Sequence, residues 1–263
     1  MVRKWACSRG FNISYRAEGS GTPLVLLHGW SRWADTWWDA GYGDTLTDDY
    51  RVIAIDRLGH GQSDKPHDAL LYVEDAIASD IVAVLTAERI DCALVWGFSM
   101  GAVDAASLAV LHPRRVAAVV CGGDTPIPSR HGDGRREQHL AMADTVGNVE
   151  GFAGLLARLG SPQEAIAESL AHNDTAALAA AMIGGADRFP AIASIQAPSL
   201  WYEGSDDHPF TPEDLQLAAR FDVETCLIPD ANHAAAFRRA DDVLRIVRPF
   251  LNDHRSRAPL TSA

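Results

Sequence analysis

The sequence predicts an α/β protein: a mostly parallel central sheet flanked by helices, with one helical insertion. Two observations carry this prediction. Short β-rich segments alternate with helical segments between residues 11 and 122, and the same alternation returns after residue 198. The stretch between them reads as several short helices without an evident strand. We therefore expect a core made of residues 1–123 and 197–263, with a helical insertion at residues 124–196.

The strands of the first half have two patterns. Residues 11–16 alternate in polarity, as expected of a half-exposed strand, whereas the others are continuously apolar, as expected of strands covered on both faces. These buried candidates are residues 23–27, 51–55, 93–96 and 116–121. Residues 72–88 carry apolar side chains at helical spacing, and residues 99–111 form an Ala-rich helix.

The second half begins with a stretch rich in Pro, Gly and charge at residues 124–136, after which Gly, Pro and Asn separate the short helices of the insertion. Beyond the insertion we expect two strands and two helices. These are strands at residues 199–202 and 223–228 and helices at residues 212–220 and 234–252. Residues 255–263 are typical of a frayed terminus.

Length and composition fit one large domain, or a domain with one insertion: 263 residues, of which 47% are hydrophobic. The net charge is −12 and no run of five basic residues occurs, which disfavours a nucleic-acid partner or an anionic membrane surface. The longest apolar stretches are far shorter than the about 18 residues that span a bilayer, and the first residues lack the apolar region of a signal peptide. We expect a cytoplasmic protein, a monomer or a homodimer, with no membrane partner.

The four cysteines lie far apart in the chain and have no zinc-ligand spacing. A disulfide framework is typical of much shorter secreted chains, so we expect buried thiols at Cys7, Cys92, Cys121 and Cys226. Neither a metal site nor a cofactor is expected.

The strongest chemical signal is Gly97-Phe98-Ser99-Met100-Gly101, which directly follows a buried strand and opens a helix. A tight strand-to-helix turn needs small residues two places on either side of its central residue, and Gly97 and Gly101 provide that room. The turn would project the Ser99 hydroxyl away from the sheet and leave the Met100 amide free to stabilise negative charge. The alternative is that Ser99 only caps the helix.

A second signal is His28-Gly29-Trp30 at the end of the first buried strand. A chain turn at this point could present the Trp30 amide over the nucleophile, where it would form a two-donor oxyanion hole with the Met100 amide. Since His28 precedes a glycine turn on a buried strand, we expect it to be a hydrogen-bonded structural residue.

His233 is the candidate base, because it lies late in the chain between the last strand and the closing helix, and a serine needs an adjacent imidazole to take its proton. The alternative is a surface loop histidine. An acid is expected to orient the imidazole, and three carboxylates compete for this role: Asp206, Asp207 and Asp124.

Together these features resemble the α/β-hydrolase fold family from about residue 11 to residue 252. The order Ser99, Asp207, His233 is that family's order of nucleophile, acid and base. The family's acid commonly follows the strand-ending glycine by three positions, which selects Asp207 after Gly204. The sequence Asp-Arg-Leu-Gly-His-Gly-Gln-Ser at residues 56–63 is similar to a structural turn of the family. A serine nucleophile disfavours dehalogenation and epoxide opening, for which family members carry Asp.

The resemblance implies that residues 124–196 form a lid that roofs the pocket. The expected pocket is hydrophobic and aromatic, suited to a small uncharged or aromatic acyl group. Its substrate-binding residues are expected to be Trp30, Phe98, Phe152 and Phe189, with three more tryptophans near its mouth, Trp33, Trp37 and Trp38.

The resulting hypothesis is a serine hydrolase that cleaves a small carboxylic ester, thioester or lactone through an acyl-enzyme, similar to the small esterases and haloperoxidase-like perhydrolases of the family. Alternatives on the same frame are C–C bond hydrolysis and cofactor-free oxygenation. A further alternative is a non-catalytic receptor that keeps the fold to bind a small molecule.

Overall fold

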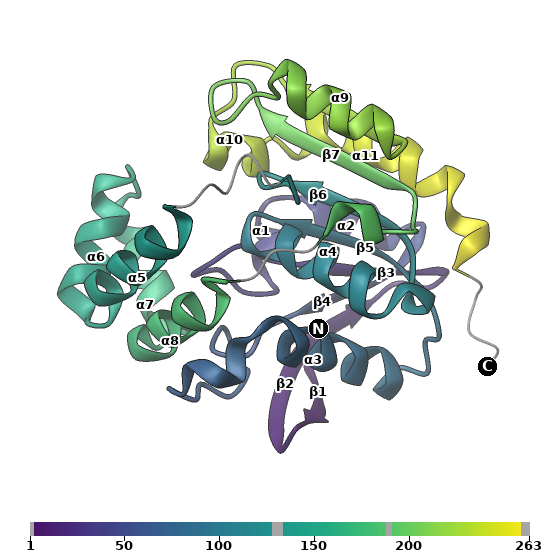
Figure 1. The fold of residues 1–263 in the computed structure, drawn as a ribbon. Coiled ribbons are helices and arrows are strands. Elements are labelled where there is room, and N and C mark those ends of the chain that lie inside the picture. Colours follow the sequence, from purple (N-terminus) through teal and green to yellow (C-terminus); the bar gives the residue numbers. More distant parts are fainter. Residues whose placement is uncertain (1–2, 128–133, 188–190, 259–263) are drawn as a thin grey trace.

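The computed structural model describes residues 3–127, 134–187 and 191–258 (Figure 1). Its strands are β1 (Arg3–Ser8), β2 (Phe11–Glu18), β3 (Thr22–Leu27), β4 (Tyr50–Ile55), β5 (Ala93–Phe98), β6 (Val116–Gly122), β7 (Ser199–Gly204) and β8 (Val223–Ile228). They form one eight-stranded sheet in the order β1-β2-β4-β3-β5-β6-β7-β8. The pairs β1–β2 and β2–β4 are antiparallel, and the other neighbouring pairs are parallel. The predicted α/β class with a mostly parallel sheet is therefore confirmed.

Helices lie on both faces of this sheet. They are α1 (Thr36–Asp39), α2 (Tyr42–Thr47), α3 (Glu74–Ala87), α4 (Met100–Leu111), α9 (Pro212–Arg220), α10 (His233–Arg238) and α11 (Ala240–Asp253). Between β6 and β7 the chain forms α5 (Arg135–Val146), α6 (Val149–Arg158), α7 (Gln163–His172) and α8 (Thr175–Gly185), here called the helical insertion. Figure 1 shows the helical insertion grouped at one side of the molecule.

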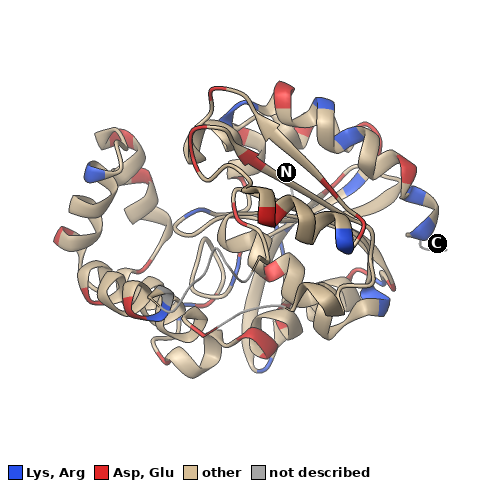
Figure 2. Cartoon of the chain, turned by 45° about the horizontal axis from the view of Figure 1, so that its top comes forward, with Lys and Arg blue, Asp and Glu red and all other residues tan. Residues whose placement is uncertain are grey.

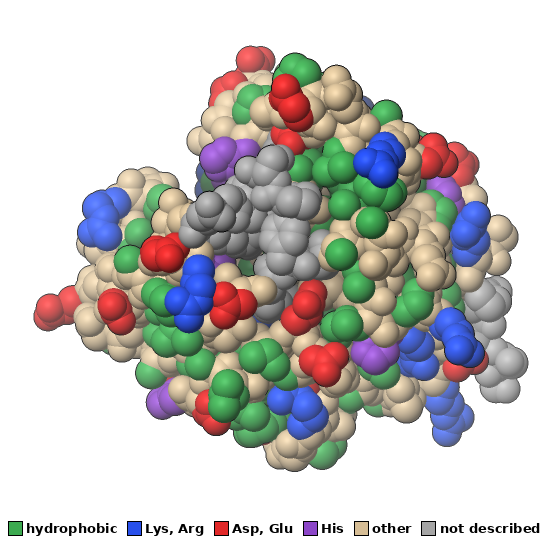
Figure 3. All heavy atoms as spheres, viewed as in Figure 1, with side chains coloured by type: hydrophobic (Ala, Val, Ile, Leu, Met, Phe, Trp, Pro, Cys, Tyr) green, Lys and Arg blue, Asp and Glu red, His purple; other side chains and the backbone are tan. Residues whose placement is uncertain are grey.

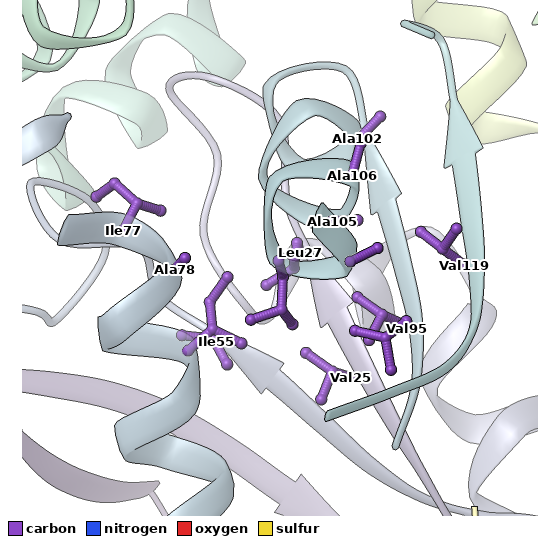
Figure 4. Packing of buried hydrophobic residues seen from close by; sticks show 14 of the residues in the cluster. Val25, Leu27, Ile55, Ile77, Ala78, Val95, Ala102, Ala105, Ala106 and Val119 are labelled. Atoms are coloured by element: carbon purple, nitrogen blue, oxygen red, sulfur yellow. The ribbon is translucent and has the colours of Figure 1, made fainter. Parts of the chain in front are cut away.

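Successive residues of a strand point to opposite faces of a sheet, and the core is divided accordingly. Val25 and Leu27 of β3 pack with α3 and α4 on one face, where Figure 4 shows Val25 beside Val95 and Leu27 beside Ala105. Leu24 and Leu26 of the same strand pack with α2 and α11 on the other face. The continuously apolar pattern of β3 reflects this coverage from both sides.

The helical insertion has a small apolar core of its own. Its buried side chains are Val146, Phe152, Leu156, Ile166 and Leu178. Helix α8 also packs on the short turn η1 (Ala69–Tyr72), so closely that a Cβ at Gly184 would lie 2.3 Å from the Ala69 carbonyl oxygen. This contact joins the helical insertion to the region that precedes α3.

Strand β1 is an edge strand that the sequence pattern does not reveal. It pairs with β2 along its whole length. Its Trp5 is 53% exposed, whereas the small side chains of Ala6 and Ser8 are buried. Because the largest apolar side chain faces solvent, the strand lacks the alternation by which a half-buried strand is recognised.

The closing helix expected at residues 234–252 is two helices, so the prediction of one continuous helix was wrong. Arg239 separates α10 from α11 and has φ −87° and ψ 62°, outside the helical region. Its guanidinium donates to the Pro229 carbonyl and pairs with Asp242, which holds the break at this position. Helix α10 begins at His233, so His233 is a helix residue and not a loop residue.

The prediction of four buried thiols was wrong for three of the cysteines. Only Cys121 is buried, whereas Cys92 and Cys226 are half-buried and Cys7 is exposed. Cys7 and Cys226 lie on β1 and β8, the two edge strands of the sheet, where one side of the strand is open. All four cysteines are free.

The surface carries charges of both signs. Figure 2 shows acidic and basic residues interspersed along the outer helices, and on the face drawn in Figure 3 hydrophobic side chains lie scattered among them. Within the three described ranges of the chain, every helix is too short or too polar to span a bilayer.

Candidate active site

The turn between β5 and α4 holds Ser99 in a strained backbone conformation. Its φ is 56° and its ψ is −122°, a region that residues with a side chain rarely adopt. The Ser99 amide donates to the Gly122 carbonyl at the end of β6 over 2.7 Å. The turn is therefore tied to the carboxyl end of the neighbouring parallel strand, where α/β proteins commonly place their ligands.

Two glycines make this turn possible. A Cβ on Gly97 would lie 1.9 Å from the Gly101 carbonyl oxygen, and a Cβ on Gly101 would lie 2.1 Å from the Leu27 carbonyl oxygen. Both distances are far inside van der Waals contact with backbone that cannot move aside. The glycines expected from the sequence motif are thus required by close approach of β5, α4 and β3.

Replacing Gly97 by alanine should therefore lower the free energy of unfolding by at least about 2 kcal/mol, because the new methyl group meets backbone atoms. The measurement is thermal or urea unfolding. Gly154→Ala in α6 is the matched control, since a Cβ there would meet only the end of the Arg158 side chain at 3.6 Å. We expect this control to be neutral or stabilising, and an equal loss in both variants would contradict the explanation.

The two residues expected to form an oxyanion hole, Met100 and Trp30, lie in the turns around Ser99. Met100 is the first residue of α4, so its amide belongs to the unpaired amides of a helix N-terminus. The turn after β3 lies against Ser99, because a Cβ on Gly29 would be 3.4 Å from the Ser99 Cβ. The expected oxyanion residues Trp30 and Met100 thus come from two turns that meet at Ser99.

Asp207 and His233 are joined by a hydrogen bond. The His233 Nδ1 and the Asp207 Oδ2 are 2.8 Å apart, although the residues are far apart in the chain. Asp207 follows β7, and the Asn232 side chain caps α10 by accepting from the Ala235 amide. The Asp207 side chain is 13% exposed and that of His233 is 45% exposed, so the carboxylate is mostly shielded while the imidazole is open to solvent.

The competing carboxylates make other contacts. Asp206 Oδ1 accepts from the Ser205 hydroxyl at an exposed position, and Asp124 Oδ1 accepts from the amide of Thr125, the next residue. Of the three candidate acids, Asp207 is the one that hydrogen-bonds His233.

The imidazole of His233 lies next to the turn that carries Ser99. It packs against the Phe98 ring at a centroid distance of 5.1 Å, and a Cβ on Gly123 would be 3.2 Å from its Cε1 atom. No hydrogen bond joins Ser99 and His233, both of which lie in the described part of the chain. Catalytic hydrogen bonds between a serine and a histidine are often long in the absence of substrate and tighten when substrate binds.

A cavity of about 150 Å³ opens beside Ser99. The described residues that line it are Trp30, Arg57, Ser99, Met100, Val103, Asp124, His139, Ala181, Met182 and Gly185. The sequence interpretation did not assign Arg57, Val103 or His139 to this site. Arg57 lies in the Asp-Arg-Leu-Gly turn, but nothing in that motif indicates that its guanidinium reaches the cavity.

Arg57 is held by a buried ion pair. Its Nε lies 3.1 Å from Asp104 Oδ2, and both side chains are at least 95% buried. Asp104 is on α4, five residues after Ser99, so the pair connects the turn after β4 with the helix that Ser99 precedes. The charge of Arg57, which lines the cavity, is thereby balanced by Asp104.

The aromatic residues expected to bind substrate take different positions. Trp30 lines the cavity and meets Phe152 edge-on at a centroid distance of 5.6 Å. Phe152 is itself fully buried in the core of the helical insertion. The Phe98 ring packs against the imidazole of His233. Phe189 lies outside the described residues.

The other tryptophans do not form the mouth of the pocket as expected. Trp37 is fully buried in the core against Trp96, Trp38 stacks under the Arg16 guanidinium at 3.6 Å, and Trp33 stacks on His172 of α7. Trp37 belongs to α1, which was not predicted, and packs with residues of α2 against one face of the sheet.

Within residues 3–127, 134–187 and 191–258, no group of three His, Cys, Asp or Glu side chains is arranged to hold a metal ion.

The sequence profile of the alpha/beta hydrolase fold family matches residues 22–163, more than half of the chain. The protein therefore belongs to this family. A putative 2-succinyl-6-hydroxy-2,4-cyclohexadiene-1-carboxylate synthase of Bacillus subtilis (strain 168) is 28% identical over 236 residues, which are 86% of this chain and 84% of that protein.

Two further similarities point to varied chemistry on this fold. A non-heme chloroperoxidase of Streptomyces lividans is 39% identical over 125 residues, 45% of this chain and 43% of that protein. Among solved structures, Est816, described as an N-acyl homoserine lactone degrading enzyme, is 27% identical with a TM-score of 0.72 and covers 94% of this chain and 100% of its own.

Proposed function

We propose that the protein is a serine hydrolase that cleaves a small carboxylic ester, thioester or lactone. The observation that carries the proposal is the hydrogen bond between Asp207 and His233 beside a serine held at positive φ on a strand-to-helix turn. A structural serine cap would need neither the strained backbone nor an oriented imidazole beside it. The lactone-degrading relative with a similar fold supports the same class of substrate.

In the proposed reaction, His233 Nε2 takes the proton from the Ser99 hydroxyl as Ser99 Oγ attacks the substrate carbonyl carbon. The carbonyl oxygen becomes an oxyanion that accepts from the Trp30 and Met100 amides. His233 then gives its proton to the leaving alcohol or thiol, and the acyl group stays on Ser99. A water molecule, deprotonated by His233, hydrolyses this acyl-enzyme, while Asp207 holds the imidazole in place.

The acyl group is expected to be small and uncharged. The cavity of about 150 Å³ is below the roughly 300–1,000 Å³ of pockets that bury drug-sized ligands. Arg57 lines the cavity but is neutralised by the buried Asp104, so this pair adds no net charge to attract an ionic substrate. We propose that residues 124–196 act as the lid, since α8 supplies Ala181, Met182 and Gly185 to the cavity.

The test is labelling with a fluorophosphonate, which reacts only with an activated serine hydroxyl, followed by turnover of p-nitrophenyl esters, methyl esters, thioesters and lactones. Labelling at Ser99 with turnover of one of these classes is the expected result. An unlabelled protein that still binds small acyl compounds would be a receptor and would contradict the proposal.

A second candidate is C–C bond cleavage or related carbon chemistry on the same three residues. It is favoured by the Bacillus subtilis relative, which spans most of the chain and is named for a carbon-ring product, not for an ester. Adding a 1,3-diketone and a cyclohexadiene carboxylate to the substrate panel distinguishes the two.

Met182 should set the size of the acyl group, because it lines the cavity from α8. We expect Met182→Phe to lower kcat/KM for hexanoyl esters by about 10- to 200-fold, as for other pocket-filling changes, and to change acetyl-ester turnover little. Ile183→Phe is the control, since Ile183 is 43% exposed on the same helix. A uniform loss on all chain lengths would contradict a role in selectivity.

A further inference from the structure

The turn that carries the Trp30 amide contains a second strained residue. Ser31 has a φ of 61° and is 3% exposed. A residue with a side chain keeps a left-handed backbone only where its surroundings hold it there. The contacts of Ser31 therefore decide the shape of the turn between Gly29 and Arg32.

The helical insertion supplies those contacts. The Ser31 carbonyl oxygen accepts two hydrogen bonds, from Ser169 Oγ and from Asn173 Nδ2, each 3.0 Å long. Ser169 lies on α7 and Asn173 ends that helix, and their exposed fractions are 1% and 9%. Asn173 Nδ2 also donates to the Ser169 carbonyl over 2.9 Å, which fixes the amide group at the end of α7.

Residues outside the helical insertion hold the other end of the same turn. The Gly29 carbonyl oxygen lies 2.8 Å from His28 Nδ1 and accepts from the Arg32 amide over 3.1 Å. His28 Nε2 accepts from the Arg57 amide, so Nε2 carries no proton and the ring proton is on Nδ1. Burial lowers the pKa of His28, which favours the same neutral form. The Gly29 carbonyl and the Trp30 N–H belong to one planar peptide and point in opposite directions.

We propose that Ser169 and Asn173 are positioning residues: by holding the Ser31 carbonyl, α7 keeps the Trp30 amide directed at the carbonyl oxygen of the substrate. The inference rests on the proposed function for its catalytic consequence. The helical insertion then has a role in the chemistry as well as in selectivity, because α7 holds one end of the turn at Ser31 while His28 holds the other end at Gly29.

The test compares three alanine variants on the same helix. Ser169→Ala and Asn173→Ala each remove one hydrogen bond to Ser31. His172→Ala is the control, since His172 stacks on Trp33, the residue that follows the turn, with parallel rings 4.0 Å apart and does not bond Ser31. Thermal unfolding is recorded for each variant, so that a loss of folding is recognised.

Two readouts separate positioning from general stability. The first is hydrogen exchange of the amides of residues 29–32, measured by mass spectrometry. The second is the kinetics of the best ester of the panel, with the inhibition constant of a boronic acid that forms a tetrahedral adduct on Ser99. We expect faster exchange, a kcat about 10-fold lower in each single variant and about 100-fold lower in the double variant, an unchanged KM, and parallel weakening of the boronate.

A second set of variants tests whether the effect passes through the Ser31 backbone. Glycine adopts positive φ without strain, so Ser31→Gly needs less holding than serine. Asn173→Ala should therefore cost less in the Ser31→Gly background than alone. Equal costs in both backgrounds would overturn the proposed route.

The remaining outcomes are also decisive. Unchanged exchange at residues 29–32 in Ser169→Ala and Asn173→Ala would overturn the inference, as would faster exchange with unchanged kcat or an equal effect of His172→Ala. Failure of the unsubstituted protein to react with a fluorophosphonate would instead contradict the proposed function, because hydrogen exchange reports the hold on the turn without turnover.

Discussion

Replacing Ser99 by alanine is expected to leave the fold intact and to lower kcat for ester hydrolysis by about 10⁶-fold. The loss is large because the nucleophile, base and acid act as one unit, so that removing the nucleophile makes the other two ineffective. Stability should be unchanged or slightly higher, since alanine keeps the Cβ and Ser99 Oγ makes no hydrogen bond within the described chain. Steady-state kinetics and fluorophosphonate labelling measure the loss of activity, and thermal unfolding measures the stability.

The matched control for this experiment is Ser79→Ala. Ser79 Oγ bonds only the Asp75 carbonyl of its own helix, α3. The control should keep activity and labelling. Full turnover by the Ser99→Ala variant would contradict the serine mechanism and favour chemistry that needs His233 without a nucleophile, such as cofactor-free oxygenation.

Asp207→Asn is expected to lower kcat by about 10⁴-fold with the fold intact. The Asp207 carboxylate accepts the proton on His233 Nδ1 and leaves Nε2 free to take the proton of Ser99. An asparagine amide can instead donate to Nδ1, which places the ring proton on Nε2 and removes the base. The measurement is kcat and KM at neutral pH, and KM should change little.

Two neighbouring carboxylates provide the comparison for Asp207. Asp206→Asn should change kcat by less than about tenfold, since its side chain bonds Ser205 at the surface. Asp124→Asn should also keep most activity, although Asp124 lines the cavity and a change in KM is expected. Collapse of Asp124→Asn with a nearly active Asp207→Asn would move the acid to the end of β6.

The sequence predicted the parts of the fold whose signals are local. Continuously apolar segments marked strands β3 to β6, and the pair Gly97 and Gly101 marked the turn of Ser99 before any distance was known. It failed where exposure hides the pattern, as at Trp5 of β1, and where one side-chain contact interrupts a regular segment, as at Arg239 between α10 and α11. At Arg239 the deciding contact is made to the Pro229 carbonyl, ten residues earlier in the chain.

For the site, the sequence by itself determined which residue types stand at the ends of which strands, because a nucleophile turn has a local steric requirement. The spacing from Gly204 selects Asp207 as the acid, and the structure has it bonded to His233. Only the tertiary structure decided that Arg57 reaches Asp104 and that α7 holds Ser31. These pairs are separated by many residues with no fixed spacing between them. Since no local periodicity encodes such contacts, they follow from the order of the strands in the sheet and from where the helical insertion packs.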